Sequence, residues 1–251
     1  MWNKHAFLCT TVLVVSFAVV CFAQSDAQPR WTDSTTTKVK PEMKQKFEGY
    51  LKQLMAAYEK AGTPWFLTLQ NLAGDTTEYT TVVPLMKFGD LDGPSVAAKI
   101  LGEAGWEHLS RNLARCYIAQ TRQYATPRTE LEINKKDVPM GIYWVETSTL
   151  VAPGRMGDYL NWLKNEYRPA LEKAGVAHFQ VSQPIFGAVA GEIVTTRMLK
   201  NLAEIDGGPV LSRALDEEGA RAVNAKAVAL VSSSNTRIVQ VRTDLSYSAG
   251  K

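Results

Sequence analysis

The sequence predicts an α+β fold in which one β-α-β-β-α-β unit is present twice in tandem. The first observation is a repeat, because landmarks of residues 31–133 return in residues 143–247 at an offset that grows from 112 to 114. The second is that both segments carry the same order of strand and helix patterns. Such a long period is typical of a duplicated domain rather than a solenoid of short repeats. The recurring landmarks are Pro41 and Pro153, Ala61-Gly62 and Ala174-Gly175, Glu78 and Glu192, Leu91 to Pro94 and Ile205 to Pro209, and the Arg-Thr-acid-Leu ends that begin at Arg128 and Arg242.

In the second copy, residues 142–147 are rich in aromatic and β-branched side chains and predict a strand that Pro153-Gly154 ends. Residues 155–173 predict a helix, because their apolar positions recur at helical spacing and Gly175 is placed to cap the end. Pro169 falls inside this pattern and predicts a kink or a shortened last turn. The apolar positions are Met156, Tyr159, Leu160, Leu163, Tyr167 and Leu171.

The rest of the second copy predicts a hairpin, a helix and a last strand. The hairpin strands are residues 178–183 and 192–198, and the turn-rich residues 184–191 connect them. The helix begins at Asp206-Gly207-Gly208-Pro209, and its apolar stripe runs from Leu211 to Leu230. Residues 232–235 predict a polar loop and residues 237–243 the last strand.

The first copy repeats this order with weaker strand patterns. We expect a strand over residues 31–39, a helix over 42–60, a hairpin over 65–83, a helix from 95 to about 117 and a strand over 121–128. The order is that of a ferredoxin-like split βαβ unit. We therefore expect a first unit over 24–133, a linker over 134–141 and a second unit over 142–251.

A four-stranded sheet with both helices on one face leaves its other face uncovered. If that face carries Phe179, Val181, Val194 or Leu67, exposing it to water forfeits roughly 25 cal/mol per Å² of apolar area. The two units can cover each other sheet to sheet, which predicts an intrachain pseudo-dimeric barrel with the helices outside. In this order of elements and these duplicated landmarks, the chain resembles the dimeric α+β barrel superfamily. The resemblance covers nearly all residues after 23 and concerns architecture. Because that superfamily includes chlorite dismutase-type haem enzymes, cofactor-free monooxygenases and stress-response proteins, it does not assign a function.

The first 23 residues predict a secretory signal peptide. A basic start at Lys4 and His5 precedes an apolar run over 6–22, and Ala23 suits a cleavage site. An uncleaved anchor helix and a lipoprotein linked through Cys21 are the alternatives. Cleavage predicts a secreted or periplasmic protein that has Cys116 as its only thiol, hence no intrachain disulfide. We expect Cys116 to be a small core residue at the end of a helix.

Composition and motifs exclude several classes of partner and site. The 28 Lys and Arg residues are scattered among 25 Asp and Glu residues without a basic stripe, so nucleic acid is not an expected partner. After cleavage we expect no membrane association, and a homo-oligomer is compatible with the sequence. The sequence contains no nucleophile elbow, zinc-protease motif, Cys-x-x-Cys pair or phosphate-binding glycine loop. With two histidines beyond the signal peptide, we expect no metal site.

Polar residues that differ between the copies are the candidate ligand-binding residues. Arg197 stands where the first copy has Val83, and the group predicted to surround a small-molecule pocket is Tyr143, Trp144, Glu146, His178 and Arg197. A solvated or ion-paired arginine and a strand-edge histidine are the alternatives. His108, whose counterpart is Ala222, is the candidate haem ligand, although a solvated histidine explains it equally well. Arg128 and Arg242 recur in both copies, so we expect them to pair with Glu130, Asp244 or neighbouring strands as scaffold.

Three functions follow from these observations. The first is binding of a small apolar or aromatic ligand without a defined catalytic residue, because the fold encloses cavities and the polar asymmetry lies in the second copy. The second is a haem-binding or cofactor-free monooxygenase-type enzyme. The third is a non-catalytic interaction module whose outer helices dock a partner. No cofactor is predicted except haem in the second case.

Overall fold

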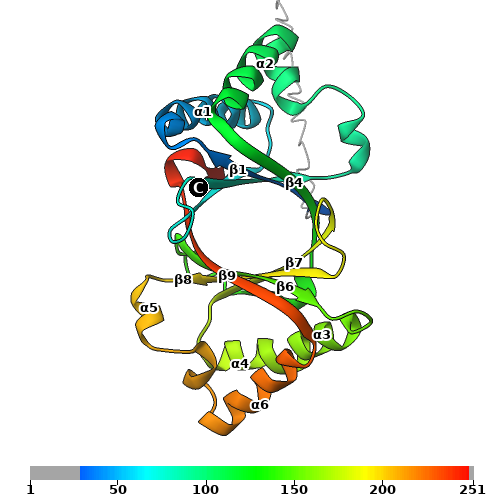
Figure 1. Cartoon of the computed structure of the whole chain (residues 1–251), viewed down its shortest axis with the longest axis vertical. Helices are drawn as coiled ribbons and strands as arrows, with labels where there is room; N and C mark the ends of the chain where they lie inside the picture. Colours follow the sequence, from blue (N-terminus) through cyan, green and yellow to red (C-terminus); the bar gives the residue numbers. More distant parts are fainter. Residues whose placement is uncertain (1–28, 249–251) are drawn as a thin grey trace, which may run out of the picture.

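Eight strands close into a barrel, and helices cover it at both ends of the long axis of the molecule (Figure 1). The computed structural model describes residues 29–248, so the predicted signal peptide lies outside the described residues. Around the ring the order is β2-β3-β1-β4-β7-β8-β6-β9, and β9 pairs with β2 to close it. The predicted α+β barrel of two units packed sheet to sheet is therefore confirmed. The strands are β1 (Trp31–Val39), β2 (Trp65–Asn71), β3 (Glu78–Leu85), β4 (Tyr117–Pro127), β6 (Tyr143–Val151), β7 (His178–Phe186), β8 (Glu192–Leu199) and β9 (Val231–Val241).

Each unit carries its helices on the outer face of its sheet (Figure 1). The first unit has α1 (Lys44–Lys60) and α2 (Val96–Cys116), with short 3-10 helices η1 (Pro41–Met43) and η2 (Phe88–Leu91). The second has α3 (Met156–Trp162), the π-helical turn η4 (Leu163–Tyr167) and α4 (Arg168–Lys173) in one continuous rod, followed later by α6 (Glu217–Val228). Within residues 29–248, no helix combines the length and apolarity needed to span a membrane.

Two predicted elements of the second copy are wrong. The helix predicted from Asp206 is broken into α5 (Ala203–Asp206), the 3-10 helix η5 (Val210–Arg213) and α6, because Gly208 has a φ of 76° and Pro209 follows it. Asp216 restarts the helix by accepting a hydrogen bond of 2.8 Å from the Gly219 N–H. The predicted loop 232–235 is the beginning of β9, because β6 pairs with these residues throughout. Similarly, β7 extends through Pro184 to Phe186 by pairing with β4.

Two short strands outside the ring also reach from one half of the molecule to the other. Strand β5 (Ile133–Asn134) pairs with β7 of the second half, and β10 (Tyr247–Ser248) pairs with β2 of the first half. At the β4–β7 contact, a Cβ on Gly187 would lie 2.0 Å from the Arg122 carbonyl oxygen. Because Gly187 also has a φ of 76°, only glycine allows this approach.

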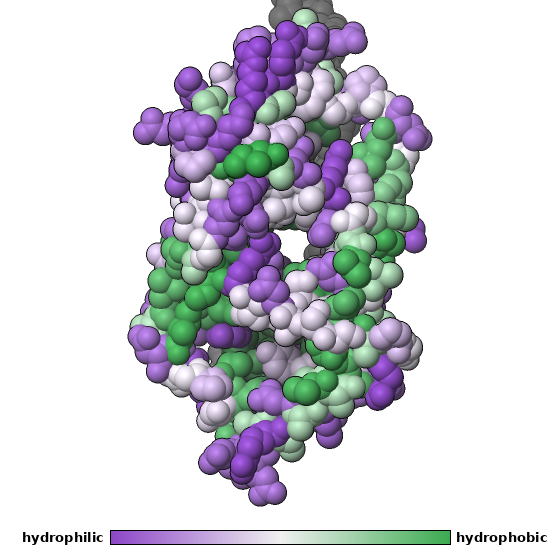
Figure 2. Space-filling view, viewed as in Figure 1, coloured by the Kyte–Doolittle hydropathy of each residue, from purple (hydrophilic) through white to green (hydrophobic). Residues whose placement is uncertain are grey.

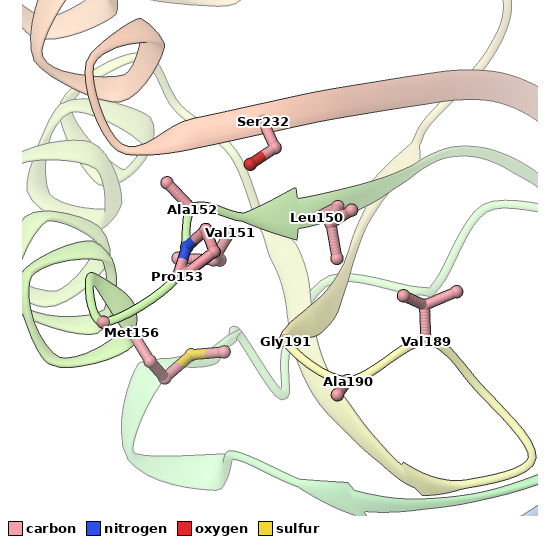
Figure 3. A pocket seen from close by; sticks show the side chains of 10 residues that line it. Leu150, Val151, Ala152, Pro153, Met156, Val189, Ala190, Gly191 and Ser232 are labelled. Atoms are coloured by element: carbon pink, nitrogen blue, oxygen red, sulfur yellow. The ribbon is translucent and has the colours of Figure 1, made fainter.

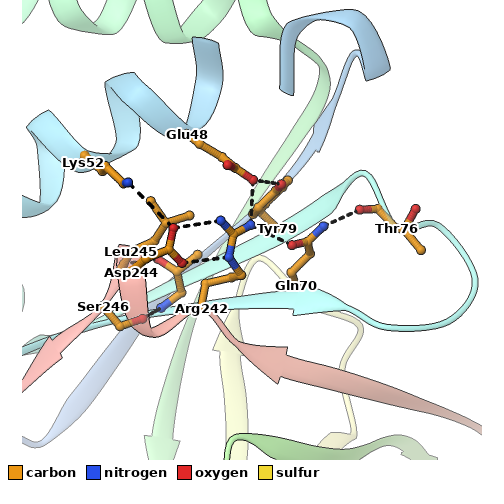
Figure 4. A network of polar contacts seen from close by, with 10 residues as sticks. Glu48, Lys52, Gln70, Thr76, Tyr79, Arg242, Asp244, Leu245 and Ser246 are labelled. Carbon is orange, nitrogen blue, oxygen red and sulfur yellow. Dashed lines mark hydrogen bonds and ion pairs between the residues drawn. The ribbon is translucent and has the colours of Figure 1, made fainter. Parts of the chain in front are cut away.

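The repeated arginines Arg128 and Arg242 also connect the two halves, as predicted. Arg242 donates to Glu48 at 2.6 Å, to Gln70 at 2.9 Å and to its neighbour Asp244 at 2.9 Å, so it joins the chain end to α1 and β2 (Figure 4). Glu48 also accepts from the Tyr79 hydroxyl. Arg128 repeats the pattern with Glu130 at 2.7 Å and Gln183 of β7 at 2.9 Å. Both arginines are therefore scaffold residues between the halves.

The main cores lie between each sheet and its helices rather than inside the barrel. Phe179 and Val181, predicted for the inner face, belong to the helix-facing core of the second unit at 1% exposure each. That prediction is wrong because strand alternation sends odd-numbered residues of β7 outward to the helices. Cys116 is fully buried at the end of α2, as predicted. The inner face has a smaller apolar cluster that contains Leu69, Trp144, Met198 and Val239.

Candidate functional site

The predicted polar group is divided between the two faces of the second sheet. Trp144 lies inside the barrel, where its indole N–H donates to the Gly141 carbonyl at 2.7 Å. Glu146 shares this inner face, two residues along β6, and Tyr143 alternates to the outer face. Arg197 pairs with Val145 and Phe179 across its two neighbouring strands and therefore faces the helices. The structure thus separates Arg197 from Glu146 and does not form the predicted group.

His178 precedes Phe179, the cross-strand partner of Arg197, and strand alternation therefore sends its side chain to the opposite face of the sheet from Arg197. Its Nε2 lies 2.7 Å from the Val138 carbonyl oxygen, and its side chain is buried against residues that connect the two units. This contact holds the connection against β7, which is a structural role. Among the described residues, no group of three or more His, Cys, Asp or Glu side chains is placed to hold a metal ion.

His108 is exposed on the outer surface of α2, where its ring contacts the Asn112 amide one turn later. Neither His108 nor His178 lines the cavity of about 440 Å³ or the cavity of about 220 Å³ that are described below. The two histidines of residues 29–248 therefore do not fit axial ligation of a haem in either cavity.

We expect His108→Ala to leave the absorbance spectrum of a haemin-treated sample unchanged. His108 is exposed on a helix, and among the described residues no pocket of surrounding side chains encloses a porphyrin there. The measurement is a titration of haemin into wild type and variant, followed in the Soret band. A Soret shift that the wild type shows and His108→Ala lacks would contradict this placement.

Charged residues inside the barrel are engaged with one another. Arg237 of β9 binds Glu78 of the first unit at 2.7 Å and Glu146 at 2.6 Å, and Ser148 donates to Glu192. Figure 2 shows a hollow between the two halves bordered mainly by hydrophilic residues. Because each of these carboxylates already has a donor, the inner network joins the two sheets and offers little free binding capacity.

One cavity of about 440 Å³ opens at the end of the second sheet (Figure 3). It lies between the β6–α3 connection and the turn that joins β7 to β8. Met156 and the aliphatic side chains of Leu150 and Val189 point into it, and Ser232 supplies its side-chain hydroxyl. With a single hydroxyl side chain to orient a ligand, this cavity offers little specificity.

A second cavity, of about 220 Å³, lies between the second sheet and its helices. We call it the aromatic cavity. Its volume is below the roughly 300 Å³ at which pockets begin to enclose drug-sized molecules, so it suits a ligand of one or two rings. The residues that line it are Thr147, Thr149, Tyr159, Trp162, Leu163, Tyr167, Thr195, Asn224, Ala227, Val228, Val231 and Ser234.

Three aromatic rings form the helix wall of the aromatic cavity. Trp162 stacks on Tyr167 with ring centroids 4.9 Å apart and packs against Tyr159 at 5.5 Å. The Trp162 indole N–H donates to the Val223 carbonyl of α6 at 3.1 Å, which fixes the ring orientation. Burial raises the pKa of Tyr159 and of Tyr167, so both phenols are neutral hydrogen-bonding groups at physiological pH.

Hydroxyl groups form the sheet wall. Thr147 and Thr195 are directly opposite each other on β6 and β8, and Thr149 follows on the same face of β6. At the mouth, Val228 of α6 is 76% exposed, which places apolar surface at the entrance. Apolar rings on one side and a few oriented hydroxyls on the other are the usual composition of a small-molecule site.

Known structures share this architecture at low sequence identity. An anthrone oxidase-like protein is 12% identical over 89% of this chain and 95% of its own, with a TM-score of 0.62. A proposed monooxygenase from Lactobacillus acidophilus NCFM is 10% identical over 89% and 98%, with a TM-score of 0.59. A mutant chlorite dismutase from Candidatus Nitrospira defluvii in complex with cyanide is 10% identical over 87% and 93%, with a TM-score of 0.50. The chain has the dimeric α+β barrel fold. No protein-family model matches the sequence, and neither does any curated protein.

The aromatic cavity lies beside a π-helical turn that, among residues 29–248, occurs in the second unit alone. Along the rod from α3 to α4, Leu163 and Tyr167 begin and end this turn, and both line the cavity. In the first unit, α1 is an uninterrupted α-helix. A π-helical turn inserted in an α-helix is frequently found at a functional site.

The sequence contained a signal for this turn. The apolar positions of the first helix are 47, 50, 51, 54, 57 and 58, and those of the second are 159, 162, 163, 167, 170 and 171. The two series match until one extra residue enters between Leu163 and Tyr167. The repeat offset changes from 112 to 113 across the same helix, so the π-helical turn accommodates a one-residue insertion.

Proposed function

We propose that the protein binds a small aromatic ligand in the aromatic cavity of its second unit. The observation that carries the proposal is the one-residue insertion that forms the π-helical turn, because it positions Leu163 and Tyr167 over the sheet hydroxyls. The rings of Trp162 and Tyr167 would hold the ligand by stacking, and Thr147 and Thr195 would orient its polar substituent.

The fold supports ligand binding in general terms, since the anthrone oxidase-like protein and the proposed monooxygenase share it. Their identity of 12% or less carries no residue to this chain, so we propose binding and assign no reaction. If the predicted signal peptide directs export, the ligand would be bound outside the cytoplasm.

The test is a substitution that fills the cavity. We expect the wild type to bind 2-naphthol saturably, and Ala227→Phe to weaken this binding by about tenfold or more, because the new ring occupies the space of the ligand. Isothermal titration calorimetry on the wild type and the variant measures the dissociation constants.

The matched control is Ala225→Phe, which places the same ring on the same helix at an exposed position that does not line the cavity. It should bind 2-naphthol like the wild type. Absence of saturable binding to the wild type, or equal binding by wild type and Ala227→Phe, would refute the site.

A further inference from the structure

Arg197 is the one arginine of residues 29–248 that is neither exposed nor ion-paired. Its Nη1 atom is buried and has no hydrogen-bond partner in the structure. Burial lowers the pKa of Arg197, as expected for a cation without a nearby carboxylate of its own. A buried donor without a partner is destabilising, so its presence requires an explanation.

The neighbouring charges do not satisfy Arg197. Glu204 is the acidic residue whose charge acts on Arg197, but its carboxylate lies 3.8 Å from Arg213, and Arg213 also donates to the Glu204 carbonyl oxygen. Arg213 itself repels Arg197. Glu204 is therefore shared with Arg213 and is not a dedicated partner of Arg197.

Arg197 adjoins the aromatic cavity on the same face of the sheet. Thr195, which lines the cavity, lies two residues before it on β8, a separation of about 7 Å along the strand. Tyr167, which also lines the cavity, is close enough to interact with the Arg197 charge. Arg197 does not itself line the cavity, but it is a neighbour of two residues that do.

The first unit has no such cation. At the matching position of β3 it has Val83, which is 8% exposed and packs in the core. An arginine in place of a buried valine costs stability unless an anion pairs with it. Within the part of the chain that the structure describes, the unpaired arginine and the π-helical turn both occur in the second unit alone, next to the same cavity.

We propose that the ligand of the aromatic cavity is an aromatic carboxylate, with its ring against Trp162 and Tyr167 and its carboxylate bound by Arg197. This inference rests on the proposed function and adds the charge of the ligand to it. A guanidinium offers parallel N–H donors that match the two oxygens of a carboxylate, and no anchored partner prevents Arg197 from turning toward the cavity.

The experiment compares 2-naphthoate with the neutral 2-naphthamide, which has the same ring system. We expect the wild type to bind 2-naphthoate about tenfold more tightly than 2-naphthamide, because the charge-assisted hydrogen bonds are available to the carboxylate alone. Arg197→Met should bind both ligands with similar affinity. Because methionine fills the site without a buried charge, the variant should also unfold at an equal or higher temperature than the wild type.

The control is Arg221→Met, which removes a positive charge from the exposed face of α6, where the Arg221 side chain is 72% exposed. It should retain the preference for 2-naphthoate, which separates a specific pair from general attraction of anions. If 2-naphthamide binds the wild type as tightly as 2-naphthoate, or if Arg197→Met keeps the preference, the carboxylate inference is overturned while the proposed cavity stands. If neither ligand binds the wild type, both fail.

Discussion

Replacing Arg242 by methionine should lower the free energy of unfolding by about 2 to 3 kcal/mol, a shift in melting temperature of roughly 5 to 10 °C for a chain of this size. The change leaves Glu48, which is 20% exposed, without its cation at 2.6 Å. It also removes the donor to Gln70 and releases the end of the chain from β2. We place the value below that of a fully buried pair because water still screens both partners.

Substitutions of two other arginines serve as comparisons for the effect of Arg242→Met on stability. Arg128→Met should cost less than Arg242→Met, since Arg128 repeats the geometry with Glu130 and Gln183 but has no helix carboxylate. Arg221→Met should change stability by less than about 0.5 kcal/mol, because both members of its pair are exposed. Thermal unfolding of the four proteins at one pH measures the series. Equal melting temperatures for Arg242→Met and Arg221→Met would contradict the assignment of Arg242 as scaffold.

The pH dependence of the Arg242→Met effect has a defined sign. The hydrogen bond from Arg242 lowers the pKa of Glu48 in the folded state, and it lowers that of Asp244 as well. A depressed carboxyl pKa adds stability that is present above the unfolded value and is lost as the pH falls through the folded value. The difference between wild type and variant should therefore be full at pH 7 and shrink as the pH falls below about 4.

Deleting Asn165 should weaken ligand binding strongly without unfolding the protein. Asn165 is exposed in the π-helical turn, and its removal restores in the second helix the apolar spacing of the first. We expect a continuous α-helix that turns Leu163 and Tyr167 onto the sheet and closes the aromatic cavity, with 2-naphthol binding at least about tenfold weaker. Calorimetric titration measures the binding, and circular dichroism measures the retained fold.

The matched control is deletion of Gln53, which is exposed at a comparable place in α1. Because α1 has no extra residue, this deletion rotates Leu54 and Tyr58 away from the first core and should cost about 3 kcal/mol or more. The same kind of change thus has opposite consequences in the two units. A variant without Asn165 that binds 2-naphthol like the wild type would show that the turn does not shape the site.

The fold was predictable because the duplication supplied two independent readings of one pattern. Strand β1 begins and ends where the pattern predicts. The ring of eight strands follows because each sheet covers the otherwise exposed face of the other sheet. The composition of residues 232–235 predicts a loop, yet pairing with β6 makes them part of strand β9. Pairing between distant segments overrides local preference in such cases.

The site was less predictable because it depends on strand register. Arg197 lies opposite Val145 rather than Glu146, and this difference of one residue sends the two charged side chains to opposite faces of the sheet. A single sequence does not fix that register. Tyr167 is an apolar position of the predicted helix, but the insertion that distinguishes this helix from its counterpart is visible only when the apolar spacing of the two copies is compared.

Strand β10 has a consequence for how the protein is made. It pairs with β2, and Tyr247 covers Phe66 with ring centroids 6.4 Å apart, although these partners are separated by most of the chain. During synthesis the first half emerges from the ribosome long before Tyr247 and Ser248 do. The part of β2 that pairs with β10 therefore stays unpaired in the nascent first unit. The first half therefore depends on the synthesis of the second half to complete the pairing of its own sheet, through β9 as well as β10.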